Sequence, residues 1–144
     1  MDLGSLVTTV SPSSVNGRRT IWEPVNIIDV DGQPPALRVQ AFEFYESPTS
    51  GANHYHRLNI ETFFVISGTM TKLVLEDVRT RKRAIFTDLG PGTRIVVPPY
   101  IAHANTFAAG TIMVAACTAA REEGVEDDYP YRLLDENGEE VAQA

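Results

Sequence analysis

The most informative stretch of this chain is residues 51–61, which read Gly-Ala-Asn-His-Tyr-His-Arg-Leu-Asn-Ile-Glu. Two histidines separated by one residue lie on the same side of a β-strand, because successive side chains alternate between its faces. The chain has 3 histidines, and the third follows a Val-Val-Pro-Pro run. His54, His56, Glu61 and His103 could therefore form a shell of three imidazoles and one carboxylate. Such a shell suits a divalent transition metal, here Fe, Zn, Mn, Ni or Co.

The remainder of the chain is typical of a β-protein with many short strands. Apolar and polar residues alternate from Val39 to Phe44, as expected when one face of a strand is buried. Turn residues, rich in Gly and Pro, separate the apolar runs, and residues 47–53 are interpreted as a loop that leads to His54. This spacing indicates an all-β sandwich or barrel. We predict strands over residues 21–30, 37–45, 60–66, 70–76, 84–87, 94–97, 102–107 and 111–118.

Both histidine segments resemble the two motifs of the cupin superfamily. The first motif runs from Gly51 through the His-Tyr-His triplet and Glu61 to Gly68, and the second joins Gly92, Pro98 and His103. The resemblance covers residues 36–117. It implies a double-stranded β-helix, the cupin jelly-roll barrel, with the three histidines and Glu61 as metal ligands.

Three features depart from the usual cupin pattern. Two residues rather than five separate Gly51 from His54. Tyr100 stands where the family usually has glycine, and Asn105 follows His103 by two residues rather than four. The acidic Asp-Tyr-Pro segment after the last strand is similar to the tail of cupins that act on nucleotide-linked sugars. We therefore divide the chain into an N-terminal arm (1–20), a cupin barrel (21–120) and an acidic C-terminal tail (121–144). Tyr129, Tyr131, Leu133 and Leu134 are expected to strap the tail to the barrel, with disorder beyond Gly138.

Composition narrows the class of protein. A length of 144 residues suits one domain with its own core. The net charge of −7 argues against nucleic acid as a partner, and no stretch is long and apolar enough to cross a membrane. The basic cluster at residues 79–83 is interpreted as a solvated hairpin turn. Residues 1–10 make a poor signal peptide, and Cys117, the single cysteine, cannot form an intrachain disulfide. We expect a cytoplasmic protein in which no cysteine neighbours the histidine motif.

Three functions are compatible with this site. The favoured one is an isomerase or epimerase, in which a metal acts as a Lewis acid on a small keto substrate such as a nucleotide-linked keto sugar. Tyr100 is the candidate acid or base, and the histidines would take that role in a metal-free site. The second function is an Fe(II)-dependent dioxygenase acting on a small organic molecule, and the third is a cupin that only binds a small molecule. A homodimer is expected, because cupins commonly pair their barrels and the arm has no core of its own.

Overall fold

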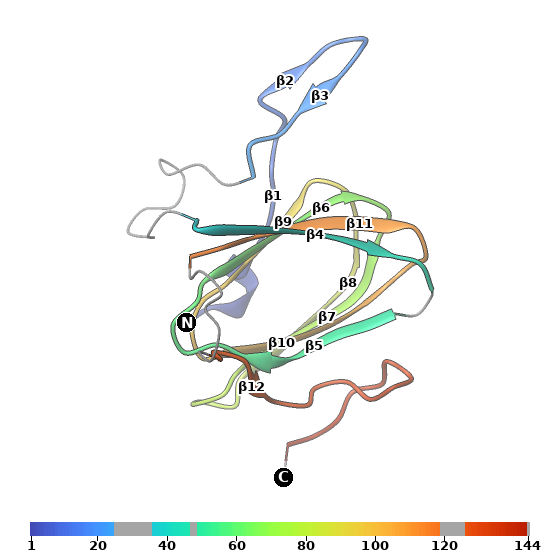
Figure 1. Cartoon of the computed structure of the whole chain (residues 1–144). Coiled ribbons are helices and arrows are strands. Elements are labelled where there is room, and N and C mark those ends of the chain that lie inside the picture. Colours follow the sequence, from blue (N-terminus) through green and yellow to red (C-terminus); the bar gives the residue numbers. More distant parts are fainter. Residues whose placement is uncertain (25–35, 47–48, 119–125, 144) are drawn as a thin grey trace.

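The structure, a computed structural model, describes residues 1–24, 36–46, 49–118 and 126–143, and two five-stranded antiparallel sheets face each other in it (Figure 1). The first sheet has the order β1 (Val7–Thr9), β9 (Thr93–Val97), β6 (Glu61–Ser67), β11 (Thr111–Cys117) and β4 (Arg38–Phe44). The second has the order β12 (Tyr129–Pro130), β5 (Thr49–Tyr55), β10 (Ile101–Phe107), β7 (Met70–Asp77) and β8 (Arg83–Leu89). This jelly roll confirms the all-β prediction.

The core lies between the two sheets. In β9 and β11 burial alternates along the strand, so that one face of the first sheet packs inward. Side chains from both sheets meet there, and removing their apolar surface from water is the main stabilising contribution. The fully buried members are Val65, Met70, Leu75, Ile95, Val97, Ile101, Phe107 and Ala115.

Strand β10 is buried along its whole length, unlike a strand with one solvated face. Its outer side is covered by the C-terminal tail, where Leu133 and Leu134 pack against Val74, Ala102 and Ala104. The predicted strapping of the tail is thus confirmed. The predicted disorder beyond Gly138 is wrong for the described residues, because residues 139–141 fold back on the strap through the Leu134–Glu140 bridge and the hydrogen bond from Val141 N–H to the Leu133 carbonyl oxygen.

The second departure from the sequence prediction concerns residues 47–53. Instead of a loop, the chain forms β5 from Thr49 and pairs with β10. Ala52 and Asn53 have φ values of 65° and 63°, and the register of the ladder shifts next to them. The Gly-Ala-Asn sequence reflects this bulge within a strand and does not mark a free loop. The other strand predictions agree with the structure, except for 21–30, most of which lies outside the described residues.

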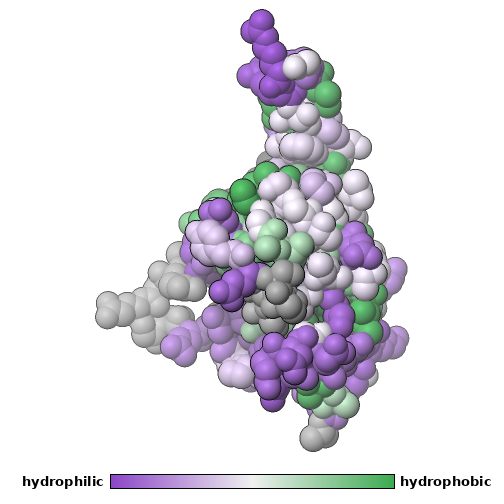
Figure 2. Space-filling model, turned by 90° about the vertical axis from the view of Figure 1, so that its right-hand side faces the viewer, coloured by the Kyte–Doolittle hydropathy of each residue, from purple (hydrophilic) through white to green (hydrophobic). Residues whose placement is uncertain are grey.

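The N-terminal arm is partly built into the barrel. The 3₁₀ turn η1 (Leu3–Leu6) buries Leu3 in the core, and β1 pairs with β9 of the same chain. The hairpin of β2 (Ser14–Val15) and β3 (Thr20–Ile21) projects from the body of the molecule (Figures 1 and 2). The basic cluster forms the β7–β8 hairpin turn, as predicted. Within the described ranges, no helix is long and apolar enough to span a membrane.

Gly68 closes the β6–β7 turn in a conformation that only glycine tolerates well. Its φ is +81°, and an added Cβ would lie 2.5 Å from Thr111 Oγ1. Gly68→Ala should therefore lower the free energy of unfolding by about 1–3 kcal/mol, as other overpacked positions do. Gly90→Ala is the matched control, since a Cβ added there would meet no atom within 4 Å beyond its chain neighbours. Equal denaturation midpoints for the two variants would contradict this account.

Candidate active site

The four predicted ligands converge at one end of the barrel. His54 in β5 and His103 in β10 are register partners in the second sheet, and His56 follows β5 directly. Glu61 is the first residue of β6 and reaches across from the first sheet. Their ligand atoms lie within 4.8 Å of one another, which is close enough to hold a metal ion. The convergence that we predicted is present, and the binding of an ion stays a prediction.

Glu61 occupies the centre of this group, which we call the His/Glu cluster. Its Oε2 lies 3.1 Å from His56 Nε2 and 3.3 Å from His103 Nε2. Neither contact has hydrogen-bond geometry, so Glu61 Oε2, His56 Nε2 and both ring nitrogens of His103 are buried without a hydrogen-bond partner. Buried polar atoms are almost always partnered in native structures. Lone pairs that face each other in this way fit a cation bound between them.

A hydrogen bond outside the cluster determines the tautomer of His56. Its Nδ1 lies 2.9 Å from the backbone carbonyl oxygen of Asp127. A carbonyl oxygen can only accept, so Nδ1 must carry the proton. The lone pair of a neutral His56 is then on Nε2, the atom that faces Glu61. Metal-binding histidines are commonly oriented in this manner, through the nitrogen that does not bind the metal.

The ionisable groups of the cluster perturb one another. Burial alone would raise the pKa of Glu61, but the imidazoles of His103 and His56 outweigh it and hold this pKa well below its usual range. Burial, together with the nearby His103 and His56, lowers the pKa of His54 to about 4. For His56, burial lowers the pKa, and the contact with Glu61 more than offsets it, so the net shift is upward. At neutral pH, the cluster thus combines an anionic Glu61 with a neutral His54.

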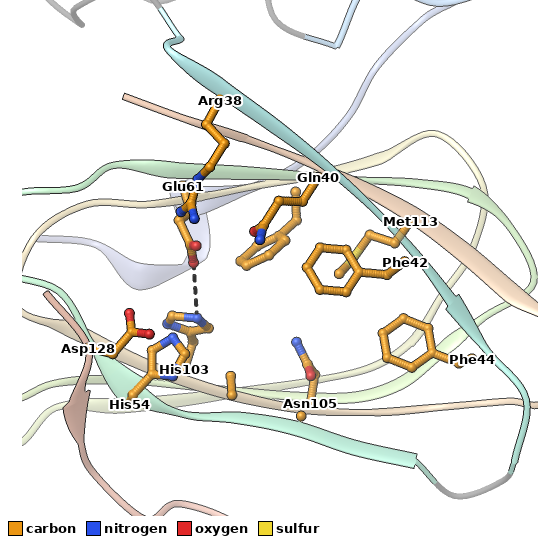
Figure 3. A pocket seen from close by; sticks show the side chains of 13 residues that line it. Arg38, Gln40, Phe42, Phe44, His54, Glu61, His103, Asn105, Met113 and Asp128 are labelled. Atoms are coloured by element: carbon orange, nitrogen blue, oxygen red, sulfur yellow. Dashed lines mark ion pairs between the residues drawn. The ribbon is translucent and has the colours of Figure 1, made fainter. Parts of the chain in front are cut away.

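A cavity of about 200 Å³ opens beside the cluster between the two sheets (Figure 3). His54, Glu61 and His103 lie at one end, with Asp128 next to them (Figure 3). The opposite end is apolar. The cavity therefore suits a small molecule that places an oxygen atom at the cluster and carbon atoms further in. The remaining lining residues are Arg38, Gln40, Phe42, Phe44, Gly51, Ala52, Phe63, Asn105 and Met113.

Sequence reasoning missed two neighbours of the cluster. Cys117 is the register partner of Glu61 on β11, and its thiol lies 3.7 Å from Glu61 Oε1, so the prediction that no cysteine neighbours the motif is wrong. Burial raises the pKa of this thiol, which favours a neutral donor over a thiolate ligand. Asp128 Oδ1 lies 3.1 Å from His56 Nδ1. The Asp-Tyr-Pro segment drew attention to this part of the tail in the sequence. It led to no prediction that Asp127 or Asp128 would lie near the histidines.

Tyr100 does not lie among the residues that line the cavity. Its ring stacks on Tyr55, with centroids 6.1 Å apart, and Arg79 covers it at 4.7 Å. Tyr55 occupies the alternate strand position between His54 and His56, so its side chain points away from the cluster. The backbone of Tyr100 has a φ of 67°, a left-handed conformation that glycine adopts without strain. Its proposed acid or base role stays an untested prediction that this placement does not favour.

Comparison with known proteins supports the fold assignment. No family model matches the chain, and no curated protein matches its sequence. Among solved structures, the WlaRB TDP-quinovose 3,4-ketoisomerase from Campylobacter jejuni is 11% identical over 85% of this chain and 89% of that one, with a TM-score of 0.71. QdtA, a sugar 3,4-ketoisomerase from Thermoanaerobacterium thermosaccharolyticum in complex with TDP, is 12% identical over 82% and 84%, with a TM-score of 0.66.

A third similar structure is the rmlC epimerase of Mycobacterium tuberculosis, 14% identical over 81% of this chain and 64% of that one, with a TM-score of 0.64. All three likenesses extend over most of the present chain. The protein thus has the cupin fold, a double-stranded β-helix, as its two histidine motifs predicted.

The lowered pKa of His54 gives a testable pH dependence. In the metal-free protein, its imidazole should stay neutral until the pH falls to about 4. Because this folded-state pKa lies below the usual 6.5, the unfolded chain binds more protons between these values. The free energy of unfolding should therefore fall as the pH is lowered through this window, and less so in His54→Gln. An NMR titration of His54 with a midpoint near 6.5 would contradict the assignment.

Proposed function

We propose that this protein is a metal-dependent isomerase or epimerase that moves a proton beside the carbonyl group of a small keto substrate. The observation that carries this proposal is the group of buried, unpartnered nitrogen and oxygen atoms around Glu61, at one end of a cavity. Solved structures of similar fold include two sugar 3,4-ketoisomerases and an epimerase, which supports isomerisation as the reaction class.

His54, His56, Glu61 and His103 would hold the ion. Three imidazoles and one carboxylate suit Fe, Zn, Mn, Ni or Co. When bound, such an ion would supply Lewis-acid stabilisation of negative charge on the substrate oxygen. The chain itself orients the ligands, since the Asp127 carbonyl oxygen fixes the His56 ring and Glu61 is held between the two sheets.

The chain must also supply a group that accepts the substrate proton. Asp128 is our candidate, because its carboxylate lines the cavity and its side chain is 59% exposed. An accessible carboxylate can take a proton from one carbon and return it to another, or to the other face of the same carbon. Phe42, Phe44 and Met113 make the far end of the cavity apolar, which would disfavour water beside a carbanionic species.

The volume of the cavity limits what it encloses. At about 200 Å³, it is below the usual range for drug-sized ligands. A nucleotide-linked keto sugar would place its reacting sugar in the cavity and leave the nucleotide outside. The TDP in the QdtA complex makes this class of substrate a reasonable first choice for assay.

The apolar end of the cavity also favours a second function, that of a dioxygenase. The apolar end of the cavity and the ligand set together would also suit an Fe(II)-dependent dioxygenase with an apolar substrate. Oxygen consumption distinguishes the two functions, because isomerisation needs no oxygen.

We also propose a homodimer. Val39 in the edge strand β4 is 70% exposed, and Leu37, just before this strand, is 65% exposed, so a second copy could cover both. Light scattering at micromolar concentration should give twice the chain mass, and a monomer mass would contradict the proposal.

Proton transfer should be visible as isotope exchange. TDP-4-keto-6-deoxyglucose, which is bound in the structure of a mutant of QdtA, is the test substrate. In heavy water and in the absence of oxygen, the metal-loaded protein should place deuterium on the carbon next to its carbonyl group. Asp128→Asn should slow this exchange by about 10²–10⁴-fold, the usual contribution of a general base. Because Asp128 Oδ1 also lies 3.1 Å from His56 Nδ1, the two proteins are compared at equal metal content. Glu136→Gln, on an exposed part of the tail, is the control. Uptake of oxygen atoms into the product would instead establish the dioxygenase.

Glu61→Gln tests the ion itself. The substitution removes the anionic ligand and leaves a side chain of nearly the same shape. We expect the purified variant to retain less than about a tenth of the wild-type metal, since even neighbouring groups of a metal site change affinity by 10–100-fold. Elemental analysis of untagged protein measures this directly. Wild-type protein that retains no metal and still catalyses exchange would contradict metal dependence.

A further inference from the structure

One residue of the acidic tail makes four hydrogen bonds to the segment that carries the cluster. The Asp127 carboxylate accepts the backbone N–H groups of Arg57, Leu58 and Asn59 at 3.0, 3.1 and 2.9 Å. Its carbonyl oxygen accepts from His56 Nδ1 at 2.9 Å. A single aspartate thus binds four consecutive residues, although about 70 positions of sequence separate it from them.

The bound segment has a particular need for such a partner. Residues 56–60 cross from β5 in one sheet to β6 in the other, with His56 at the start and Glu61 directly after. Consecutive N–H groups in a crossing segment have no ladder to pair with. Asn59 is only 3% exposed, so its backbone donor would be costly to leave unpaired. A carboxylate is a strong acceptor for them, because a charged acceptor makes shorter and stronger hydrogen bonds.

We propose that Asp127 is a positioning residue for the His/Glu cluster. Its carboxylate fixes the backbone at residues 57–59, and this anchoring holds its carbonyl oxygen against His56 Nδ1. The proton therefore stays on Nδ1, so that Nε2 faces Glu61 as a free ligand atom. The effect on metal binding rests on the function proposed above, whereas the effect on the His56 tautomer does not. The tail thus orients one member of the His/Glu cluster.

The tail is attached firmly enough for this role. Asn53 Oδ1 accepts the backbone N–H groups of Leu133 and Leu134 at 2.8 and 2.9 Å, and both leucine side chains are buried. Asn53 directly precedes His54, so the strap and the cluster share one strand. These contacts hold the tail, and with it Asp127, in a fixed position beside β5.

Asp135 provides a matched control within the same tail. Its Oδ1 accepts the backbone N–H groups of Asn137 and Glu139, each at 2.9 Å. Asp135 therefore anchors a local turn with the same chemistry as Asp127. It makes no hydrogen bond to a member of the cluster in the described part of the chain. Any effect that depends only on anchoring the tail should appear in Asp135→Ala as well.

The test uses the full chain with two readouts. Affinity for Co²⁺ is measured by competition with a chelator, and the His56 tautomer is read from ¹⁵N chemical shifts of the metal-free protein at alkaline pH. Asp127→Ala should weaken Co²⁺ binding by about 10–100-fold, as loss of an orienting partner does, and should shift His56 from the Nδ1–H form to a mixture. Asp127→Asn keeps an acceptor oxygen and should lie between Asp127→Ala and wild type. Asp135→Ala should match wild type in both readouts.

The outcomes separate this proposal from the proposed function. Wild-type protein that binds no Co²⁺ would overturn metal dependence, and the tautomer measurement would still decide the role of Asp127. Wild-type affinity and an unchanged tautomer in Asp127→Ala would overturn the positioning role. Equal losses in Asp127→Ala and Asp135→Ala would also overturn it, because they would show a general effect of the tail. If Asp127→Ala does not fold, Asp127→Asn gives the same comparison.

Discussion

The arrangement of this site depends on one buried carboxylate that joins the two sheets. Glu61 starts a strand of the first sheet and places Oε2 between His56 and His103, which belong to the other side of the barrel. An anion that is only 6% exposed is costly unless cationic or hydrogen-bonding groups surround it. A proton on His56 or a bound metal ion would each satisfy Glu61. The positive charge that stabilises the buried Glu61 carboxylate is therefore also the charge that a metal site would use in catalysis.

Each group around Glu61 has a different effect on the cluster. The thiol of Cys117 contacts Oε1, which leaves Oε2 for the imidazoles. The low pKa of His54 keeps a neutral nitrogen at the cavity. Because the Asp127 carbonyl oxygen orients the His56 ring, the chain itself fixes the direction in which Nε2 points. Such preorganisation is the main contribution that a protein makes to an electrostatic site.

The tail has a larger part in the structure than an acidic end would suggest. It covers the outer side of β10 with two leucines, and it supplies both Asp127 and Asp128 to His56. Burial of the whole of β10 is therefore a consequence of the tail and not of a third layer. The same contacts explain why acidic residues gather near a site that holds imidazoles, since negative charge stabilises the histidines when they carry a proton or face a cation.

The sequence by itself determined the class of fold and the four members of the cluster. Alternation in strands and the placement of Gly68 and His103 are local or regularly spaced properties, so they can be read from a single chain. Tertiary structure alone decided the rest. Cys117 meets Glu61 only because β11 lies beside β6 in the sheet, and Tyr100 turns away from the histidines because its turn places the ring on Tyr55. Sequence periodicity assigns a side chain to a face of its own strand, and it does not specify which strand or tail lies against that face.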